Sequence, residues 1–411
     1  MFLTRLLNSE KVRKRRPTLL LRALLFVVSV NVTPLTLAES LSGEISFGYL
    51  QYWEHRDGFA PNQTQIDIIP RIRTDMSDDV FLIFEPGLRA RNRSDDSPFF
   101  APYKSRLVAY LAQWEMTVGY DIVFWGASEG AQILDILNQR DLGSDFNGDT
   151  KLGQPLINLS GYIGDGLATF YYLPYTPKRR FRADTERLSS GFSIDSDNTY
   201  WQDNQNAYYP GFAARYAYSF DAVDIALVGF HGINREPAFL LDAGQFSPLY
   251  TVGTQMGLDI QWVTGNLLTK VEILNSSKAP TQQGHFEETT QYVVGGEYSM
   301  FDVFSSGIDV RWVGEYSNNT LGDALLSLYQ HDVLLAMHTS FNDVDATALS
   351  LSLLHDVDHH SNILEATLTR RINQNVELAI SLFDFSGMSP ADFFFGLETD
   401  NYGEMTVTYY F

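Results

Sequence analysis

The stretch Glu404-Met405-Thr406-Val407-Thr408-Tyr409-Tyr410-Phe411 lies at the end of the chain, and its side chains alternate in character. One parity holds Met, Val, Tyr and Phe, and the other holds Glu, Thr, Thr and Tyr. A period of two indicates a β-strand, because successive side chains of a strand point to opposite faces of the sheet. The stretches 256–262, 266–273, 308–312 and 376–382 have the same period. The sequence therefore predicts an all-β protein.

Eighteen such strands can be placed along the chain, and the connections between them alternate in length. The strands are expected to start near residues 42, 64, 79, 104, 115, 155, 167, 209, 223, 250, 266, 287, 306, 327, 346, 361, 376 and 402. Short turns, as at 76–79 and 373–375, alternate with longer loops, as at 126–154 and 176–208. Such sorting is typical of outer-membrane barrels. We predict a transmembrane antiparallel β-barrel of 18 strands, with 16 as the next alternative.

The composition excludes several classes of protein. The 411 residues are 45% hydrophobic and 19% charged, carry a formal charge of −21 and include no cysteine. An acidic chain argues against a nucleic-acid partner. Disulfides, thiolate metal sites and cysteine catalysis all need cysteine. We expect no nucleic-acid partner, no cofactor and no metal.

Residues 1–38 have the pattern of a secretory signal peptide. A basic run at 11–16 precedes an apolar run at 19–30, and Thr36-Leu37-Ala38 offers a cleavage site before Glu39. A single membrane anchor is the alternative, but a helical span needs about 20 apolar residues. We predict a signal peptide over 1–38 and a barrel over 39–411. The barrel would place the exported chain in the cell outer membrane.

The strand pattern also predicts which side chains face the lumen. A Lys or Arg at the lipid-facing midplane costs about 2–4 kcal/mol, so the apolar parity is expected to face lipid. The predicted pore-lining residues have the other parity, and they are Asp67, Arg71, Arg73, Glu85, Arg89, Arg91, Asp259, Lys270, Glu272, Asp309, Arg311, Glu315, Glu365, Arg371 and Glu377. Arg370 is an exception that is expected to snorkel beside a short turn.

The turn after the second strand fixes a register that can be checked. If it centres on residues 77–79, positions whose numbers sum to 156 face each other. Arg71 then lies opposite Glu85, and Asp67 lies opposite Arg89. Opposite charges directly across two strands attract each other. Independent solvation of these charges is the alternative.

The third long loop, 126–154, carries the most distinctive sequence. Its first residues belong to the motif WGASEG at 125–130, and the apolar residues 133, 134, 136 and 137 have helical spacing. We predict a short amphipathic helix over 131–141 that packs on the lumen wall, so that the loop folds inward and narrows the pore. The predicted constriction residues are Trp125, Gly126, Glu129, Gly130, Asp135, Asn138 and Asp141. Helix capping and loop anchoring are alternative roles for Asp135 and Asn138.

Three features resemble known groups of proteins. The terminal stretch resembles the signature that the barrel-assembly machinery recognises in Gram-negative outer-membrane proteins, with Phe411 as the assembly signal. The inward loop is similar to the third extracellular loop of general porins. Residues 125–141 also resemble a poorly characterised Gram-negative outer-membrane family with Trp-Gly, an acid and Gly, then Asp, Asn and Asp. Glu129 stands where that family has Asp, and Gln139 where it has Pro, so the resemblance is partial. It does not identify a solute.

Three other motifs each have two interpretations. The stretch 145–149 has oxygen ligands with the spacing of half a calcium loop, or it is a solvated turn. The His- and Asp-rich stretch 355–360 is either a metal site or a polar surface loop. The basic run 178–182, with Arg187, either attracts anions and lipopolysaccharide phosphates or is a solvated loop. No motif for catalysis is found, including Gly-x-Ser-x-Gly and His-Glu-x-x-His.

The sequence thus favours a porin-like channel for passive diffusion of small solutes, without enzymatic activity. Its expected partners are outer-membrane lipid and lipopolysaccharide, the barrel-assembly machinery and a small-molecule solute. A hydrolase at the rim of the barrel is one alternative, which a Ser–His pair within hydrogen-bond distance would favour. A plugged structural or adhesive barrel is the other.

Overall fold

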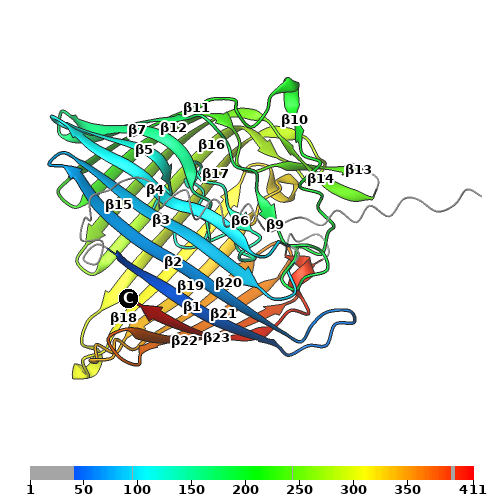
Figure 1. Cartoon of the computed structure of the whole chain (residues 1–411). Coiled ribbons are helices and arrows are strands. Elements are labelled where there is room, and N and C mark those ends of the chain that lie inside the picture. The colour runs from blue at the N-terminus through cyan, green and yellow to red at the C-terminus, as the bar shows by residue number, and fades with distance from the viewer. Residues whose placement is uncertain (1–40, 95, 243, 390–393) are drawn as a thin grey trace, which may run out of the picture. The chain divides into compact units, whose positions relative to one another are not determined.

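Eighteen antiparallel strands form one closed sheet in the part of the chain that the structure describes. The computed structural model describes residues 41–411 apart from 95, 243 and 390–393, so the predicted signal peptide lies outside the described residues. The barrel strands are β1 (Leu41–Tyr52), β2 (Asn62–Ser77), β3 (Val80–Arg91), β4 (Phe99–Leu111), β5 (Trp114–Asp121), β7 (Gln154–Ile163), β8 (Gly166–Leu173), β11 (Gly211–Phe220), β12 (Val223–Ile233), β15 (Val252–Thr264), β16 (Leu267–Pro280), β17 (Phe286–Met300), β18 (Asp309–Asn319), β19 (Asp332–Ser340), β20 (Ala348–Asp356), β21 (Asn362–Arg371), β22 (Val376–Ser386) and β23 (Tyr402–Tyr410). The predicted fold class and strand number are confirmed (Figure 1).

The first and last strands close the barrel. β1 pairs with β23 from Glu44 opposite Tyr410 to Tyr52 opposite Tyr402. The backbones of Gly43 and Phe411 extend this seam with two hydrogen bonds, of 2.9 and 3.1 Å. Closure leaves no unpaired strand edge, which is how a sheet satisfies its backbone groups without help from water.

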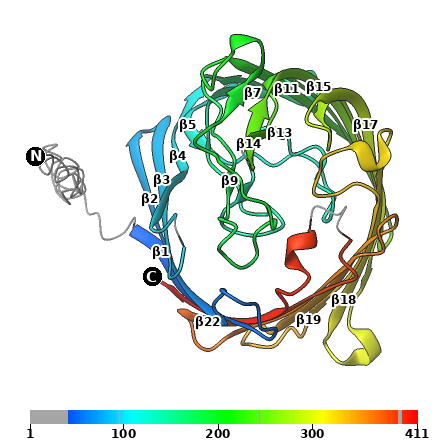
Figure 2. The ribbon, with the colours of Figure 1, turned by 90° about the vertical axis from the view of Figure 1, so that its right-hand side faces the viewer.

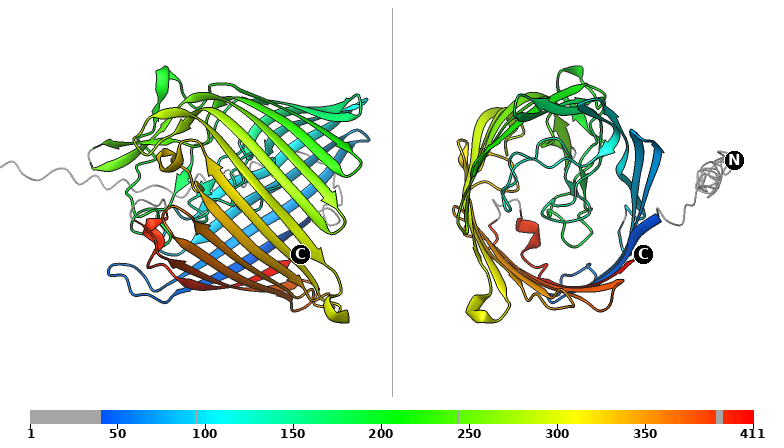
Figure 3. Two further views of the ribbon diagram at one scale, coloured as in Figure 1. Left: turned by 180° about the vertical axis from the view of Figure 1, so that it is seen from behind. Right: turned by 90° about the vertical axis from the view of Figure 1, so that its left-hand side faces the viewer.

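The connections alternate in length, as the sequence predicts. Two residues separate β4 from β5, β7 from β8, β11 from β12 and β15 from β16, whereas the segments 122–153, 174–210 and 234–251 connect strands at the other end. Figure 3 shows the two ends from behind and along the axis. Some predicted long loops are shorter than expected, because β4 begins at Phe99 and β16 continues to Pro280, so that paired hairpins extend into them.

The outer face of the barrel is apolar. Ile45 and Phe47 on β1, Leu364 on β21 and Leu382 on β22 are between 41% and 50% exposed. Ser46, Glu365 and Ser381 have the opposite parity and are polar, whereas Ile363 and Phe383 share that parity and pack on a buried cluster. Trp53, Trp262 and Trp312 are also exposed. Among the described residues, none of the helical segments has the length and apolar character needed to span a bilayer.

The register predicted for β2 and β3 is confirmed. Asp67 faces Arg89, and the flanking pairs Gln65–Arg91 and Ile72–Phe84 keep the same sum. The side chains of Asp67 and Arg89 form an ion pair. Arg71, which was expected to pair with Glu85 on β3, forms its ion pair with Glu44 on β1, at 3.0 Å.

Short strands inside the long loops, which the sequence analysis does not anticipate, join those loops to one another. β6 (Asp141–Leu142) pairs with β9 (Arg180–Phe181). β13 (Ala238–Asp242) and β14 (Gln245–Tyr250) form a hairpin, to which β10 (Tyr200–Trp201) adds a third strand. Figure 2, viewed from the long-loop end, shows the segments around β9 and β14 inside the ring of barrel strands.

The predicted helix over 131–141 is wrong. This segment has turns and bends but no helix, with tight backbone bonds from Ile133 to Ala131 and from Ile136 to Leu134. A helix satisfies its own backbone groups and buries only one face. Here Leu134 and Leu137 are 0% and 1% exposed, and side chains from elsewhere bond the backbone. The apolar residues do pack on the wall, but as an irregular extended segment.

Candidate functional site

The segment between β5 and β7, residues 122–153, lies against the inner wall of the barrel and is called the inner loop below. Figure 2 shows it crossing inside the ring. Its Trp125 contacts Tyr171 of β8 edge to face, with ring centroids 5.6 Å apart. Leu134 and Leu137 join a buried cluster with wall residues that include Leu274 of β16. Burial of these side chains holds the loop on the wall.

Two wall carboxylates bind four consecutive backbone N–H groups of the inner loop. Glu272 Oε1 on β16 accepts from Ala127 and Ser128, at 2.5 and 2.6 Å. Glu315 on β18 accepts from the next two residues, Glu129 and Gly130, each at 2.8 Å. Hydrogen bonds to a charged acceptor are the strong ones. We call these contacts of residues 126–130 with the two carboxylates the loop latch.

A glycine at position 126 makes the loop latch fit. Gly126 has φ +87°, and a Cβ there would lie 2.7 Å from Glu272 Oε1. That φ is a left-handed conformation that a side chain disfavours. The WG motif of the sequence thus has a structural reason: Trp125 is buried, and Gly126 lets the backbone approach the wall.

Lys270 on β16 neutralises part of this acidic cluster. Its Nζ donates to the carbonyl of Ala127 at 2.8 Å and lies 3.1 Å from Glu315 Oε1 and 2.5 Å from Glu297 Oε1. Asp259 on β15 adds a further buried carboxylate, directly opposite Glu272 in the strand ladder. Four predicted pore-lining residues, Asp259, Lys270, Glu272 and Glu315, therefore meet at the loop latch.

The side chain of Glu129 extends the cluster toward β18 and β19. It forms ion pairs with Arg311, at 3.3 Å, and with His338 Nε2. Arg311 also binds Glu297 at 2.6 Å. The sequence analysis predicts Arg311 but misses Glu297 and His338. Both have the lumen parity of their strands, so the parity rule already covers Glu297, and a count that included histidine would have added His338.

Side chains within the inner loop hold its shape. Asn138 accepts from Val123 N at 2.8 Å and donates to the carbonyls of Asp121 and Leu152 at 3.1 and 2.9 Å. Asp135 forms an ion pair with Lys151. Both residues thus anchor the loop, which is the alternative that the sequence analysis leaves open, although no helix is present to be capped.

The far end of the inner loop is joined to β3 and to the basic run. Asp141 forms an ion pair with Arg180 at 2.6 Å. Arg91 on β3 donates to the carbonyl of Gly143, and its neighbour on the same face, Arg89, pairs with Asp67.

The other predicted pore-lining residues lie away from these loop contacts. Arg371 and Glu377 are register partners beside a short turn. The rest contact groups of the wall or of a turn: Arg71 pairs with Glu44, Arg73 lies over the Phe81 ring, Glu85 is opposite Lys104, Asp309 accepts from Asn342, and Glu365 accepts from Thr367.

The basic run is folded onto acidic and carbonyl partners. Arg179 makes a bidentate pair with Glu236, at 2.6 and 2.8 Å. Arg182 donates to backbone carbonyls, and Arg187 pairs with Asp400 at 2.7 Å. All three arginines are at least nine-tenths buried. Neither interpretation of the run as a solvated or anion-attracting loop describes these three residues.

The side chains of the two stretches with metal-like spacing bond neighbouring groups of the chain. Both carboxylate oxygens of Asp145 accept backbone N–H groups, from Gly148 at 2.6 Å and Thr150 at 2.7 Å, as in a tight turn. Burial raises the pKa of Asp145. His355 and His359 bond Asn362 and Asp356. Within the described residues, no group of three or more His, Cys, Asp and Glu side chains is placed to hold a metal ion.

One Ser–His pair lies within hydrogen-bond distance on the wall. Ser350 Oγ is 3.0 Å from His338 Nδ1, and His338 Nε2 contacts Glu129. The serine and the histidine are direct register partners of β19 and β20. Their contact is what an antiparallel ladder gives to two polar residues on one face.

Comparisons with known proteins identify the fold. No family model matches the chain, and no curated protein matches it. Among solved structures, OccK11 (OpdR) of Pseudomonas aeruginosa has a TM-score of 0.53 at 10% identity, over 91% of this chain and 96% of that chain. A mutant of the Rh. blastica porin has a TM-score of 0.44 at 12% identity, over 90% of this chain and 99% of that chain. The OccK11 likeness shows a shared barrel fold.

Proposed function

We propose that the chain is a porin-like channel of the cell outer membrane, through which small solutes diffuse without a cofactor or an energy source. The loop latch is the observation that carries this proposal. Two charged wall residues hold the inner loop across the inside of a closed barrel, which is an arrangement suited to narrowing a water-filled lumen. The apolar exterior suits surrounding lipid.

The predicted pore-lining set would select solutes by charge and width. Acidic and basic side chains alternate around the loop latch, with Lys270 and Arg311 between Glu272, Glu297 and Glu315. Such a mixed wall favours water and polar solutes over apolar ones. In this proposal outer-membrane lipid and lipopolysaccharide surround the barrel, and the barrel-assembly machinery reads Phe411.

Planar-bilayer conductance tests the proposal. The refolded chain should conduct, and deletion of 127–140 should raise the single-channel conductance, because it removes the loop latch from the lumen. The double variant Glu272→Gln and Glu315→Gln should raise it less, since four hydrogen bonds weaken while the apolar contacts remain. Glu377→Gln, a carboxylate on β22 away from the inner loop, is the matched control. Absence of conductance even after the deletion would reject the channel and favour a plugged structural or adhesive barrel.

The series Ser350–His338–Glu129 favours a serine hydrolase as the second candidate function. A nucleophilic serine needs a base and donors for the oxyanion. His338 supplies the base, but backbone N–H groups in paired strands already bond their neighbours. We therefore favour the channel. Labelling by a fluorophosphonate that is lost in Ser350→Ala would reverse that preference.

A further inference from the structure

The lumen face of β20 to β23 carries a patch of small hydroxyl side chains. They are Ser350, Thr367, Thr369, Ser381 and Thr406, and we call them the hydroxyl window. Ser350, Thr367 and Ser381 face one another along one row of the strand register. Thr369 and Thr406 lie in the next row, on either side of Ala379. Each of the five residues is half-buried, so part of its surface remains accessible to a solute.

The strand alternation places the hydroxyl window inside the barrel. Its residues have the parity of Glu365, one of the predicted pore-lining residues. The side chains of opposite parity on the same strands are apolar and belong to the outer face. Among them, Leu368, Ile380 and Met405 are 40%, 41% and 45% exposed. Because successive side chains of a strand point to opposite faces, the hydroxyl groups face the lumen.

Charged side chains border the hydroxyl window. On the long-loop side, Glu365 and Glu404 accept hydrogen bonds from window threonines, at 3.0 and 3.1 Å. On the short-turn side, Arg371 and Glu377 are register partners. The second row of the window continues through small uncharged residues, which are Ala348, Ala379 and Gly48. A charged solute would find no counter-charge within the window, and an anion would be repelled at its acidic border.

A pocket of about 240 Å³ continues the row of Ser350 toward β17. Ser299, Arg311 and His338 precede Ser350 in that row, and all four residues line the pocket. A buried water needs about 10–15 Å³ by this measure, so the pocket has room for about a dozen non-hydrogen atoms or more. A six-carbon sugar or sugar alcohol is of that size.

The accessible groups of this pocket suit a neutral solute that both donates and accepts hydrogen bonds. The charge of Arg311 is balanced, because its Nη1 donates to Glu129 at 3.3 Å and to Glu297 at 2.6 Å. Its Nε and Nη2 have no hydrogen-bond partner among the described residues, and its side chain is 37% exposed. Asp309 adds acceptor oxygens, and Phe301, which is 66% exposed, adds an apolar ring. Apolar surface with a few convergent polar groups is typical of sites for small molecules.

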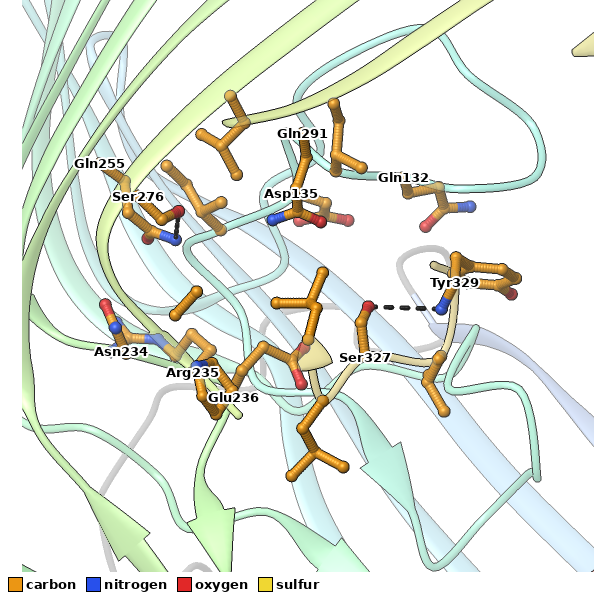
Figure 4. Close-up of a pocket in the computed structure, with 18 of the residues that line it drawn as sticks. Gln132, Asp135, Asn234, Arg235, Glu236, Gln255, Ser276, Gln291, Ser327 and Tyr329 are labelled. Carbon is orange, nitrogen blue, oxygen red and sulfur yellow. Dashed lines mark hydrogen bonds between the residues drawn. The ribbon is translucent and has the colours of Figure 1, made fainter. Parts of the chain in front are cut away.

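The inner loop lies on the long-loop side of the hydroxyl window. Its Phe146 packs edge to face on Phe383 of β22, two residues beyond Ser381, with ring centroids 5.8 Å apart. A smaller cavity of about 70 Å³, between the inner loop and the segment 320–331, is shown in Figure 4. It offers a solute little to bind, because polar atoms around it, such as Asp135 Oδ1 and Gln255 Oε1, are buried. A solute that passes the inner loop therefore meets the hydroxyl window next.

We propose that the channel selects neutral polyhydroxylated solutes, the class of sugars and sugar alcohols, and that the hydroxyl window and the adjoining pocket bind them. The hydroxyl groups replace the water around such a solute, since each can both donate and accept a hydrogen bond. Glu365 and Glu404 accept from further solute hydroxyls at the border. The inference rests on the proposed channel function and names its solute class.

Binding of four probes to the full chain, refolded in a detergent without a sugar headgroup, tests the proposal. Sorbitol, gluconate and glucamine share one six-carbon polyhydroxylated chain and are neutral, anionic and cationic. Triethylene glycol is neutral but has ether oxygens in place of most hydroxyls. In saturation-transfer NMR, we expect sorbitol to bind about fivefold or more tightly than each of the others, because they lose hydrogen bonds or bring an unpaired charge.

The three comparison probes each define a contrary result. Equal affinity for triethylene glycol and sorbitol would mean that the wall does not recognise hydroxyl groups. Tighter binding of gluconate would assign selection to the basic residues of the lumen, and tighter binding of glucamine would assign it to the carboxylates. Any of these results, or no saturable binding of sorbitol, would overturn the proposal.

A pair of threonine variants tests the window itself. Thr367→Val with Thr406→Val keeps the shape of both side chains and removes two hydroxyl groups, so sorbitol should bind about fivefold more weakly while triethylene glycol is unchanged. Thr169→Val is the matched control. Thr169 lies on β8, outside the window, and its hydroxyl is 2.9 Å from Ser160 Oγ, as that of Thr367 is from Ser381 Oγ. Equal sorbitol affinity in the folded double variant and in the control would contradict the window. If the double variant does not fold, the four-probe comparison on the unaltered chain decides.

Binding and conduction fail separately. Saturable sorbitol binding without conductance would reject the channel and keep the window as a binding site. Conductance without preference for sorbitol would keep the channel and reject the solute class. Where both hold, sorbitol should also reduce the ion current saturably, and triethylene glycol should do so only at higher concentration.

Discussion

Gly126 of the inner loop and Glu272 of β16 approach so closely that a Cβ at position 126 would lie 2.7 Å from the Glu272 carboxylate. Gly126→Ala should therefore dislodge the loop latch. The left-handed φ adds a cost of about 1–2 kcal/mol for any side chain. We expect faster protease cleavage within 122–153 and a noisier, larger single-channel conductance.

Gly164→Ala separates the clash with Glu272 from the cost of a side chain in the left-handed backbone conformation. Gly164 has φ +63°, and nothing lies within 4 Å of a Cβ there. This control pays the backbone cost at a short turn but makes no clash. Equal cleavage of the inner loop in both variants would mean that the contact with Glu272 does not hold it.

Asn138 offers a test of the anchoring role independent of the loop latch. Asn138→Ala leaves Val123 N–H and the carbonyls of Asp121 and Leu152 without their side-chain partner. Loss of three hydrogen bonds, one buried and two partly buried, should cost about 3 kcal/mol and loosen the inner loop. Hydrogen exchange of the peptide 121–139 should speed up, while exchange in β20 to β22 stays unchanged.

Asn198→Ala is the matched control for that experiment. Asn198 is exposed, and its amide contacts are 3.2 to 3.5 Å long. It should leave the exchange of 121–139 at the wild-type rate. Wild-type exchange in Asn138→Ala as well would remove the anchoring role.

The strands were predictable from sequence because the barrel is built from local alternation. Parity alone places Lys270, Glu272 and Glu315 on one face, and turn length alone sets Asp67 opposite Arg89. The prediction of a helix over 131–141 is wrong because the apolar spacing fits both a helix and an irregular segment buried on the barrel wall. The conformation that this segment adopts depends on residues far away in the sequence. Arg235, which donates to the carbonyl of Leu137, is almost a hundred residues distant.

The charge networks of the long loops could not be predicted for the same reason. Arg179 and Glu236, or Arg187 and Asp400, meet only after the barrel brings three loops to one mouth. No period or motif in the sequence encodes such pairs. The sequence therefore shows the basic run 178–182, but it does not predict that the arginine side chains are buried.

The seam of the barrel predicts a folding defect. A Cβ at Gly43 would lie 2.6 Å from the carbonyl of Ile69 and 2.7 Å from the Phe411 ring. Gly43→Ala should therefore lower the yield of closed barrel, measured as the heat-modifiable band in gel electrophoresis. Gly48→Ala meets only the flexible ends of Gln65 and Glu404 and should fold normally. Equal yields would show that the seam opens enough to accept a methyl group.

Acid should loosen the contact between the segment 174–210 and the β12–β13 connection. Burial raises the pKa of Glu236, but the charge and hydrogen bonds of Arg179 outweigh this and lower that pKa below its usual value. A carboxyl group with a lowered pKa stabilises the fold above the usual glutamate pKa, about 4.3, and loses this as the pH falls through the lowered value. The Glu236 side chain is 37% exposed, so solvent screens the effect, and a difference measurement is needed.

Protection of the peptide 177–182 from hydrogen exchange should fall below pH 4.3 in the wild type. In Glu236→Gln it should be lower at pH 6 and flat over the same range, whereas Asp96→Asn, which changes the exposed partner of Arg180, should keep the wild-type profile. A wild-type loss of protection with its midpoint above pH 4.3 would contradict the assignment to Glu236.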